Sequence, residues 1–295
     1  MVPDQAAPWR PLRRTLELLE MIKFQHSLFA LPFGLTALIV AARGLPDLRT
    51  ALLVVACMVS ARTAAMTWNR IADRRFDAEN PRTRERALPA GRVRLAEAWT
   101  LLALSCAGFV AASAGLNRLT LLLSPVALAT VLGYSLAKRV TPLTHFLLGL
   151  SLALAPIGAW IAVRGRLEGP PLLLGLGVAA WTAGFDLLYA CQDVDFDRAA
   201  GLHSLPARLG VVGSLRVSEA CHLVAVASFC AFGLAAGLGL GWWLAMAVAS
   251  ALLLAAHAIV RPDDLSRVGL AFFQLNVGVG AAVLAGAAWD VLRAA

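Results

Sequence analysis

The chain has 295 residues, of which 59% are hydrophobic and only 15% are charged, and its mean hydropathy is +0.73. A soluble domain has about 25% charged residues, so this composition excludes a soluble enzyme and predicts a polytopic membrane protein. The net charge of +8 matters less than where the positive residues lie along the chain.

Apolar segments long enough to cross a bilayer follow one another through the sequence. A transmembrane helix needs roughly 20 apolar residues, and we identify nine such segments. They span residues 20–42, 50–70, 95–115, 117–136, 144–163, 171–191, 212–236, 239–259 and 267–291. Membrane barrel strands would alternate over about ten residues, whereas these segments are longer and rich in Leu and Ala. The predicted fold is therefore all-α, with nine transmembrane helices in one domain covering residues 1–295.

Lysine and arginine residues are distributed unevenly between the two sides of this predicted bundle. Eighteen of the 26 lie on the side of the N-terminus and six on the other side, while Lys23 and Arg62 lie inside predicted spans. Since positively charged loops stay in the cytoplasm, the bias predicts a cytoplasmic N-terminus in a bacterial-type inner membrane. An odd number of spans then places the C-terminus outside.

The second predicted span continues into a densely charged segment, residues 69–91. At about 100° per residue, four oxygen-bearing side chains of this segment share one helical face: Asn69, Asp73, Asp77 and Asn80. Pro81 lacks the N–H that a continuing helix would use, so we expect the helix to end there. Three arginines follow the predicted turn: Arg82, Arg84 and Arg86.

A similar face recurs about 120 positions later, within residues 186–208. Its members are spaced as on one helical face: Asp186, Tyr189, Asp193 and Asp197. Phe76-Asp77 corresponds to Phe196-Asp197, and the sequence Leu-Pro-Ala follows both motifs. The chain therefore looks like an internal duplication with one acidic helix end in each half. Asp195 falls on the opposite face, toward solvent or Arg198.

Carboxylates beside arginines at a membrane surface suit a ligand that carries phosphate and requires a divalent metal. Mg²⁺ is usually held by one or two carboxylates together with substrate phosphates, and nearby Arg or Lys would neutralise the remaining charge. A diphosphate bound where helices reach into hydrocarbon suggests a lipid tail. The alternative is that the acidic residues are solvated helix ends paired to Arg, but two matching motifs favour a binding site.

Three further positions are candidates for substrate binding. Arg62 lies inside the second span on the face of Asn69, where a charge is costly and a functional role is the default; the alternative is a structural ion pair with an aspartate. Lys23 lies near a span end, where its side chain could instead extend to the membrane surface. Lys138 follows Tyr134 by one helical turn and could instead be a cytoplasmic anchor.

The two motifs resemble the signatures of the UbiA superfamily of intramembrane aromatic prenyltransferases. The first is Asn69-Arg70-x-x-Asp73-x-x-x-Asp77-x-x-Asn80-x-Arg82-Thr83, and the second is Asp186-x-x-Tyr189-x-x-x-Asp193-x-x-x-Asp197. The resemblance implies a nine-helix bundle around a central cavity that opens sideways to lipid. It also implies Mg²⁺-dependent transfer of a polyprenyl group from its diphosphate to an aromatic ring.

The resemblance also assigns roles to individual residues. It implies a metal site made of Asn69, Asp73, Asp77, Asp193 and Asp197, with the four aspartates essential for catalysis. Substrate binding would fall to Lys23, Arg62, Arg70, Arg82, Tyr134, Lys138, Asp186 and Tyr189. Of these, the residues expected to contact the diphosphate are Arg62, Arg70, Arg82, Tyr134 and Lys138. Lys23 and Arg62 are also the candidates for holding an acceptor carboxylate.

Two segments indicate the branch: Lys23-Phe-Gln-His26 and Tyr189-Ala-Cys-Gln-Asp193 resemble the 4-hydroxybenzoate polyprenyltransferase-like group. Some of its members act on a dihydroxynaphthoate in the futalosine route to menaquinone, so ubiquinone and menaquinone biosynthesis both stay open. The other possibilities are a different UbiA-type prenyltransferase, a terpene cyclase or, from another class, a membrane transporter. The expected partners are the two substrates and the lipid bilayer, without nucleic acid or an obligate protein partner.

Overall fold

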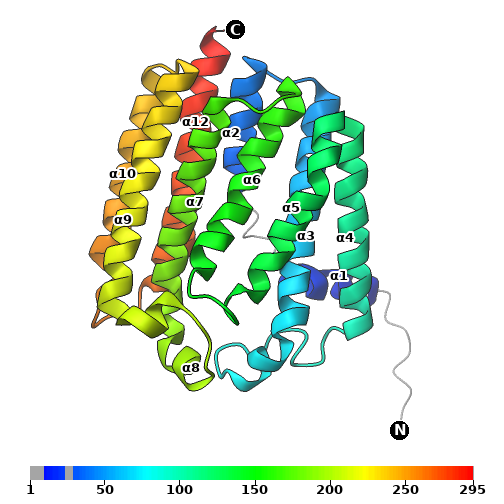
Figure 1. Ribbon diagram of the computed structural model, residues 1–295, viewed down its shortest axis with the longest axis vertical. Coiled ribbons are helices and arrows are strands. Elements are labelled where there is room, and N and C mark those ends of the chain that lie inside the picture. The colour runs from blue at the N-terminus through cyan, green and yellow to red at the C-terminus, as the bar shows by residue number, and fades with distance from the viewer. Residues whose placement is uncertain (1–9, 24–28, 295) are drawn as a thin grey trace.

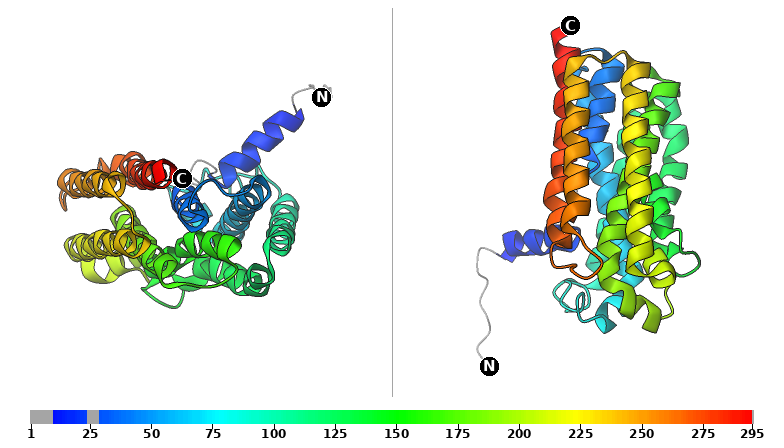
Figure 2. Two further views of the ribbon diagram at one scale, coloured as in Figure 1. Left: turned by 90° about the horizontal axis from the view of Figure 1, so that it is seen from above. Right: turned by 90° about the vertical axis from the view of Figure 1, so that its left-hand side faces the viewer.

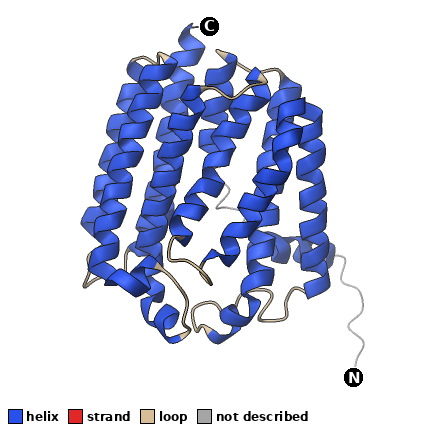
Figure 3. Cartoon of the chain, viewed as in Figure 1, coloured by secondary structure: helices blue, strands red, loops and turns tan. Residues whose placement is uncertain are grey.

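A computed structural model describes residues 10–23 and 29–294 of the chain. These described residues form helices and connecting turns, and no strand occurs among them (Figure 3). The long helices are α3 (Leu48–Glu79), α4 (Leu95–Leu116), α5 (Arg118–Ala137), α6 (Thr144–Arg164), α7 (Gly169–Ala190), α9 (Leu205–Ala236), α10 (Leu240–Ile259) and α12 (Asn276–Ala294). The shorter segments are α1 (Arg10–Met21), α2 (Leu31–Ala42), the 3₁₀ turn η2 (Cys191–Asp193), α8 (Val194–Ala199), α11 (Val268–Leu270) and the π-helical η3 (Ala271–Leu275).

Eight helical segments of the described chain are long and apolar enough to cross a membrane. A ninth apolar helix, α2, stands among them in the bundle but has only 12 residues. At 1.5 Å per residue it is about 18 Å long, shorter than the hydrocarbon core of about 30 Å. The predicted all-α membrane bundle is confirmed.

The first predicted span, 20–42, differs from the structure because it is not one helix. α1 ends at Met21 and α2 begins at Leu31. Lys23 adopts a left-handed backbone with φ of 49°, which a continuing α-helix does not allow. Pro32 then stands in the first turn of α2, a position that suits proline because no helical N–H is needed there. Figure 2 shows α1 lying across the bundle axis instead of along it.

The bundle helices pack in a closed circuit that runs α2, α3, α5, α6, α7, α9, α10, α12 and back to α2, with α4 outside α3 and α5 (Figure 2). Glycines allow the closest contacts in this circuit. A Cβ on Gly149 of α6 would lie 2.2 Å from the carbonyl oxygen of Ala179 on α7. Between the helices, edge-to-face aromatic contacts join Phe29 to Trp181 and to Phe272. The predicted central cavity stays a prediction.

The acidic motifs lie at the same end of the bundle. In Figure 1 the lower end of α3 and the short helix α8 lie at the bottom, whereas α12 ends at the top. Capping residues fix several helix ends. Asp47 accepts a hydrogen bond from the Thr50 N–H at the start of α3, and Asn117 accepts two at the start of α5. The fold therefore brings residues about 120 positions apart into one region.

Candidate active site

The first motif forms the last turns of α3. This helix continues without interruption to Glu79, and Asn80 is its C-cap, so the predicted helix end before Pro81 is confirmed. Asp73 and Asp77 are 3% and 5% exposed. Both carboxylates are therefore nearly buried, and a buried carboxylate needs partners that offset the loss of water.

Asp73 obtains its partners from α3 and from the end of α5. The Lys138 ammonium lies 2.9 Å from Oδ2, and a guanidinium nitrogen of Arg139 lies 3.5 Å from Oδ1. Asn69 donates its amide N–H to Oδ2 at 3.2 Å. The sequence predicted that Asn69 and Asp73 share a face and left open whether Lys138 faces the site or is a cytoplasmic anchor. The structure brings these three residues together.

Asp77 is surrounded by arginines. Arg86 contacts Oδ1 at 2.7 Å, and Arg70 lies 3.8 Å from Oδ2. Arg70 is itself buried, and its Nε donates to the Met21 carbonyl at 3.2 Å. Oδ2 of Asp77 is buried and has no hydrogen-bond partner among the described residues. A buried carboxylate oxygen of this kind is a ready ligand for a cation.

The second motif is not the single α-helix that the spacing predicted. α7 ends at Ala190, η2 forms one 3₁₀ turn, and α8 then begins at Val194. Asp193 leaves the helical region with φ of −106° and ψ of 7°. A 3₁₀ turn has about 3.0 residues per turn instead of 3.6, so the four predicted side chains do not stay on one straight face.

Arg82 joins the two motifs across the site. Its guanidinium donates to both oxygens of Asp193, at 2.8 and 2.5 Å, and to the Tyr189 hydroxyl at 2.8 Å. Burial lowers the pKa of the Arg82 guanidinium, but the hydrogen bonds to Asp193 and Tyr189 outweigh it, so the pKa is raised. Arg82 therefore keeps its positive charge and holds the loop after α3 against η2.

Two more contacts complete the second motif. Ser204, which caps α9, donates to Asp197 at 2.9 Å. His145, at the start of α6, lies with Nδ1 2.7 Å from Oδ2 of Asp186. Lys138 interacts electrostatically with Asp197 as well as bonding Asp73, so it lies between the two motifs.

Arg62 and Tyr134 lie further into the bundle than the acidic motifs, and we call them the deeper layer. Arg62 lies on α3 seven residues before Asn69, and it interacts electrostatically with the Tyr134 hydroxyl on α5. Tyr134 in turn is close to Arg70 and Asp186. The Nε of Arg62 is buried and has no hydrogen-bond partner within residues 10–23 and 29–294. The alternative role for Arg62 was a structural ion pair with an aspartate. Among the described residues, the aspartates near the site pair with other basic side chains and not with Arg62.

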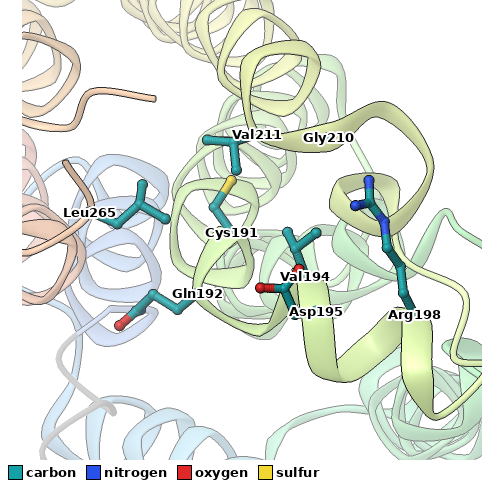
Figure 4. A pocket seen from close by; sticks show the side chains of 8 residues that line it. All are labelled: Cys191, Gln192, Val194, Asp195, Arg198, Gly210, Val211 and Leu265. Carbon is teal, nitrogen blue, oxygen red and sulfur yellow. The ribbon is translucent and has the colours of Figure 1, made fainter. Parts of the chain in front are cut away.

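Not every candidate joins this cluster. Lys23 lies at the end of α1, and its described interactions are with Glu20. Asp195 lines a pocket beside η2 and α8 together with Cys191, Arg198 and Leu265, and none of the other site aspartates lines it (Figure 4). Asp195 is exposed, in keeping with the prediction that it faces solvent or Arg198.

Sequence reasoning did not assign roles to Arg86 and Arg139, and it also missed His145 and Ser204. Each of the latter two bonds an aspartate of the second motif but belongs to a different helix, 41 residues before Asp186 and 7 residues after Asp197 respectively. No periodicity of the sequence pointed to His145. Ser204 precedes Leu205-Pro206, which is a recognisable helix start, so its capping role was within reach.

The donor set of the cluster fits Mg²⁺ bound together with a diphosphate. Its ligating groups are carboxylate and amide oxygens, which magnesium prefers, and Asp77 has an oxygen without a hydrogen-bond partner among the described residues. The same part of the chain contains no group of three or more His, Cys, Asp or Glu side chains that would hold a metal alone. A magnesium ion held here would complete its coordination with phosphate oxygens or water.

Fold and site together define an integral membrane protein with two acidic motifs at one end of a helical bundle. Residues 30–278 match the UbiA prenyltransferase family, so the chain belongs to this family and is a prenyltransferase. The 4-hydroxybenzoate octaprenyltransferase of Vibrio cholerae serotype O1 is 32% identical over 275 residues, which cover 92% of this chain and 94% of that protein.

Solved structures show the same fold. The apo structure of a UbiA homolog from Aeropyrum pernix K1 has a TM-score of 0.82 and 39% identity, and the match covers 88% of this chain and 96% of that one. A UbiA homolog from Archaeoglobus fulgidus bound to GPP and Mg²⁺ has a TM-score of 0.68 at 18% identity, over 90% of this chain and 99% of that one. The second likeness concerns the fold alone.

Proposed function

We propose that this protein catalyses the Mg²⁺-dependent transfer of a polyprenyl group from polyprenyl diphosphate to an aromatic acid. The observation that carries the proposal is the meeting of the two motifs through Arg82, with basic side chains interleaved among four aspartates. The curated relatives named 4-hydroxybenzoate octaprenyltransferase support an aromatic acid as the acceptor. A dihydroxynaphthoate is the alternative acceptor.

The ion pairs of the site suggest how a diphosphate is bound. In the structure, Asp73, Asp77 and Asp193 are each paired with an arginine or a lysine. We propose an exchange of partners in which the basic side chains turn to phosphate oxygens. The carboxylates, with Asn69 and Asp197, then become free to hold the metal. Bound Mg²⁺ would neutralise charge on the diphosphate leaving group.

The residues of this chain have separate tasks in the transfer. Arg82, Arg70 and Lys138 would bind the diphosphate and stabilise it as the carbon–oxygen bond breaks. The apolar helices around the site would exclude water from the allyl cation that forms. In the deeper layer, Arg62 would bind the carboxylate of the acceptor, while Asp186 would accept a hydrogen bond from its hydroxyl group. Tyr134 lies between them.

Products distinguish this proposal from its rivals. Membranes containing the protein would be incubated with a polyprenyl diphosphate, Mg²⁺ and each candidate aromatic acid, and the products identified by mass. We expect a prenylated acid with 4-hydroxybenzoate or with a dihydroxynaphthoate. Diphosphate release with a cyclised hydrocarbon and no need for an acceptor would indicate a terpene cyclase, and uptake without turnover would indicate a transporter.

We further propose that the chain is one domain built from two similar halves, and that the site faces the cytoplasm in a bacterial inner membrane. The excess of positive residues on the side of the motifs supports this orientation. A reporter fused after Arg86 should read cytoplasmic, and one fused to the C-terminal end should read external. Two reporters on the same side would contradict the orientation and the nine-span topology.

A further inference from the structure

Asp186 differs from the other paired aspartates of the site in its partner. Asp73, Asp77 and Asp193 each contact arginine or lysine, whereas Asp186 contacts the imidazole of His145 at 2.7 Å. His145 is 3% exposed, while the Asp186 side chain is 24% exposed. The imidazole is thus enclosed behind the carboxylate, and the carboxylate keeps an accessible side.

The surroundings of the ring indicate its tautomer. Nε2 of His145 is buried and has no hydrogen-bond partner within the described part of the chain. A proton on Nε2 would leave a buried N–H without an acceptor, and orphaned buried N–H groups are rarer in proteins than under-satisfied acceptors. The proton therefore belongs on Nδ1, where the ring donates it to Oδ2 of Asp186. This arrangement is an imidazole whose Nδ1–H points at the carboxylate from behind it.

Asp186 also has a defined place relative to the deeper layer. It interacts electrostatically with Tyr134, which is close to Arg62. The bond to His145 uses one carboxylate oxygen and fixes the plane of the group. A carboxylate fixed in this way, with a buried arginine on the other side of its interaction with Tyr134, suits a ligand that has a hydroxyl at one end and a carboxylate at the other.

We propose that His145 is a positioning residue that holds Asp186 oriented toward the hydroxyl group of the aromatic acceptor. This inference rests on the proposed function and adds to it a residue that sets acceptor specificity from the helix behind the site. It requires no proton transfer to His145. The imidazole acts through Asp186 and does not itself contact the acceptor.

The test uses the full-length protein and variants that separate shape from hydrogen bonding. His145→Phe keeps a ring but removes the donor, whereas the amide of His145→Asn replaces the Nδ1 donor. We expect His145→Phe to raise the KM for 4-hydroxybenzoate at least tenfold and to leave the KM for the prenyl diphosphate within twofold. His145→Asn should restore most of the loss, and His145→Phe should have no further effect in an Asp186→Asn background.

Three results would overturn the proposal: equal changes in both KM values, additive effects of His145→Phe and Asp186→Asn, or an asparagine variant as impaired as the phenylalanine variant. Binding without turnover provides a separate readout. The proposal predicts that His145→Phe weakens binding of 4-hydroxybenzoate but not of benzoate, which lacks the hydroxyl, and equal weakening of both would also overturn it. If His145→Phe shows this selective weakening but the wild-type protein transfers no prenyl group, the proposed function fails while the role of His145 stands.

Discussion

Arg82 provides the sharpest test of the partner exchange, because its side chain can be altered in steps. The guanidinium bonds both oxygens of Asp193 and the hydroxyl of Tyr189. A lysine keeps the positive charge but loses the planar fork that bonds two oxygens at once. We therefore expect Arg82→Lys to weaken the binding of the prenyl diphosphate and Arg82→Leu to weaken it further.

The structure sets the expected size of the change in KM for the prenyl diphosphate. A hydrogen bond to a charged group contributes about 1.5–3 kcal/mol. Since the Arg82 side chain is 34% exposed and that of Asp193 is 20% exposed, solvent screening favours the lower bound. Losing one hydrogen bond to a phosphate oxygen in Arg82→Lys then costs about 1.5 kcal/mol, which raises the KM for the prenyl diphosphate about tenfold. Arg82→Leu loses both bonds of the fork, and the expected rise is about a hundredfold.

Two measurements check this reasoning. The first is the KM for the prenyl diphosphate, with Arg84→Leu as the matched control. Arg84 lies two residues further along the chain. Its side chain is 65% exposed, and its ion pair is with the exposed Glu85 at 3.7 Å instead of with an aspartate of the site. The second is calorimetric binding of Mg²⁺ without substrate, which should tighten in Arg82→Leu because Asp193 loses its competing partner. Weaker binding of both Mg²⁺ and diphosphate would refute the exchange and indicate that Arg82 only holds the fold together.

Two further predictions concern the deeper layer and the packing of the bundle. Arg62→Leu should raise the KM for the aromatic acid more than Arg62→Lys does, because lysine keeps the charge. Normal transfer by Arg62→Leu with both substrates at low concentration would show that Arg62 has only a structural role. Gly149→Ala should lower the thermal unfolding temperature, because its Cβ would lie 2.2 Å from a backbone oxygen of α7, an overpacking that costs about 1–3 kcal/mol. Gly158→Ala on the same helix meets nothing within 4 Å and is the control; equal melting of both variants would contradict this packing argument.

The sequence predicted those features of the site that depend on local spacing. Asn69, Asp73 and Asp77 follow the helical period, and Pro81 marks the end of their helix, so the structure of the first motif was foreseeable. Hydrophobic length likewise predicted the long helices. Both signals lie within a few turns of one helix, where chain geometry leaves few alternatives.

Features that depend on tertiary contacts or local breaks were not predictable. The pairs Arg82–Asp193 and His145–Asp186 join residues 111 and 41 positions apart, and only the packing of the bundle brings them together. The 3₁₀ turn η2 interrupts the second motif at residues without a proline or glycine. The break after α1 was missed, although the polar residues Lys23, Gln25, His26 and Ser27 interrupt the apolar segment and Pro32 gave a further signal.

The most direct test of the central claim is a transfer assay with purified protein, a polyprenyl diphosphate and 4-hydroxybenzoate, in which the released diphosphate and the prenylated acid are both quantified with and without Mg²⁺. Asp73→Ala and Asp193→Ala, one substitution in each motif, are assayed in parallel. We expect equal amounts of the two products from the wild-type protein with Mg²⁺, and loss of both products when Mg²⁺ is chelated or in either folded variant. Transfer that persists without Mg²⁺, or near-normal turnover in both variants, would contradict a metal–diphosphate site built from the two motifs.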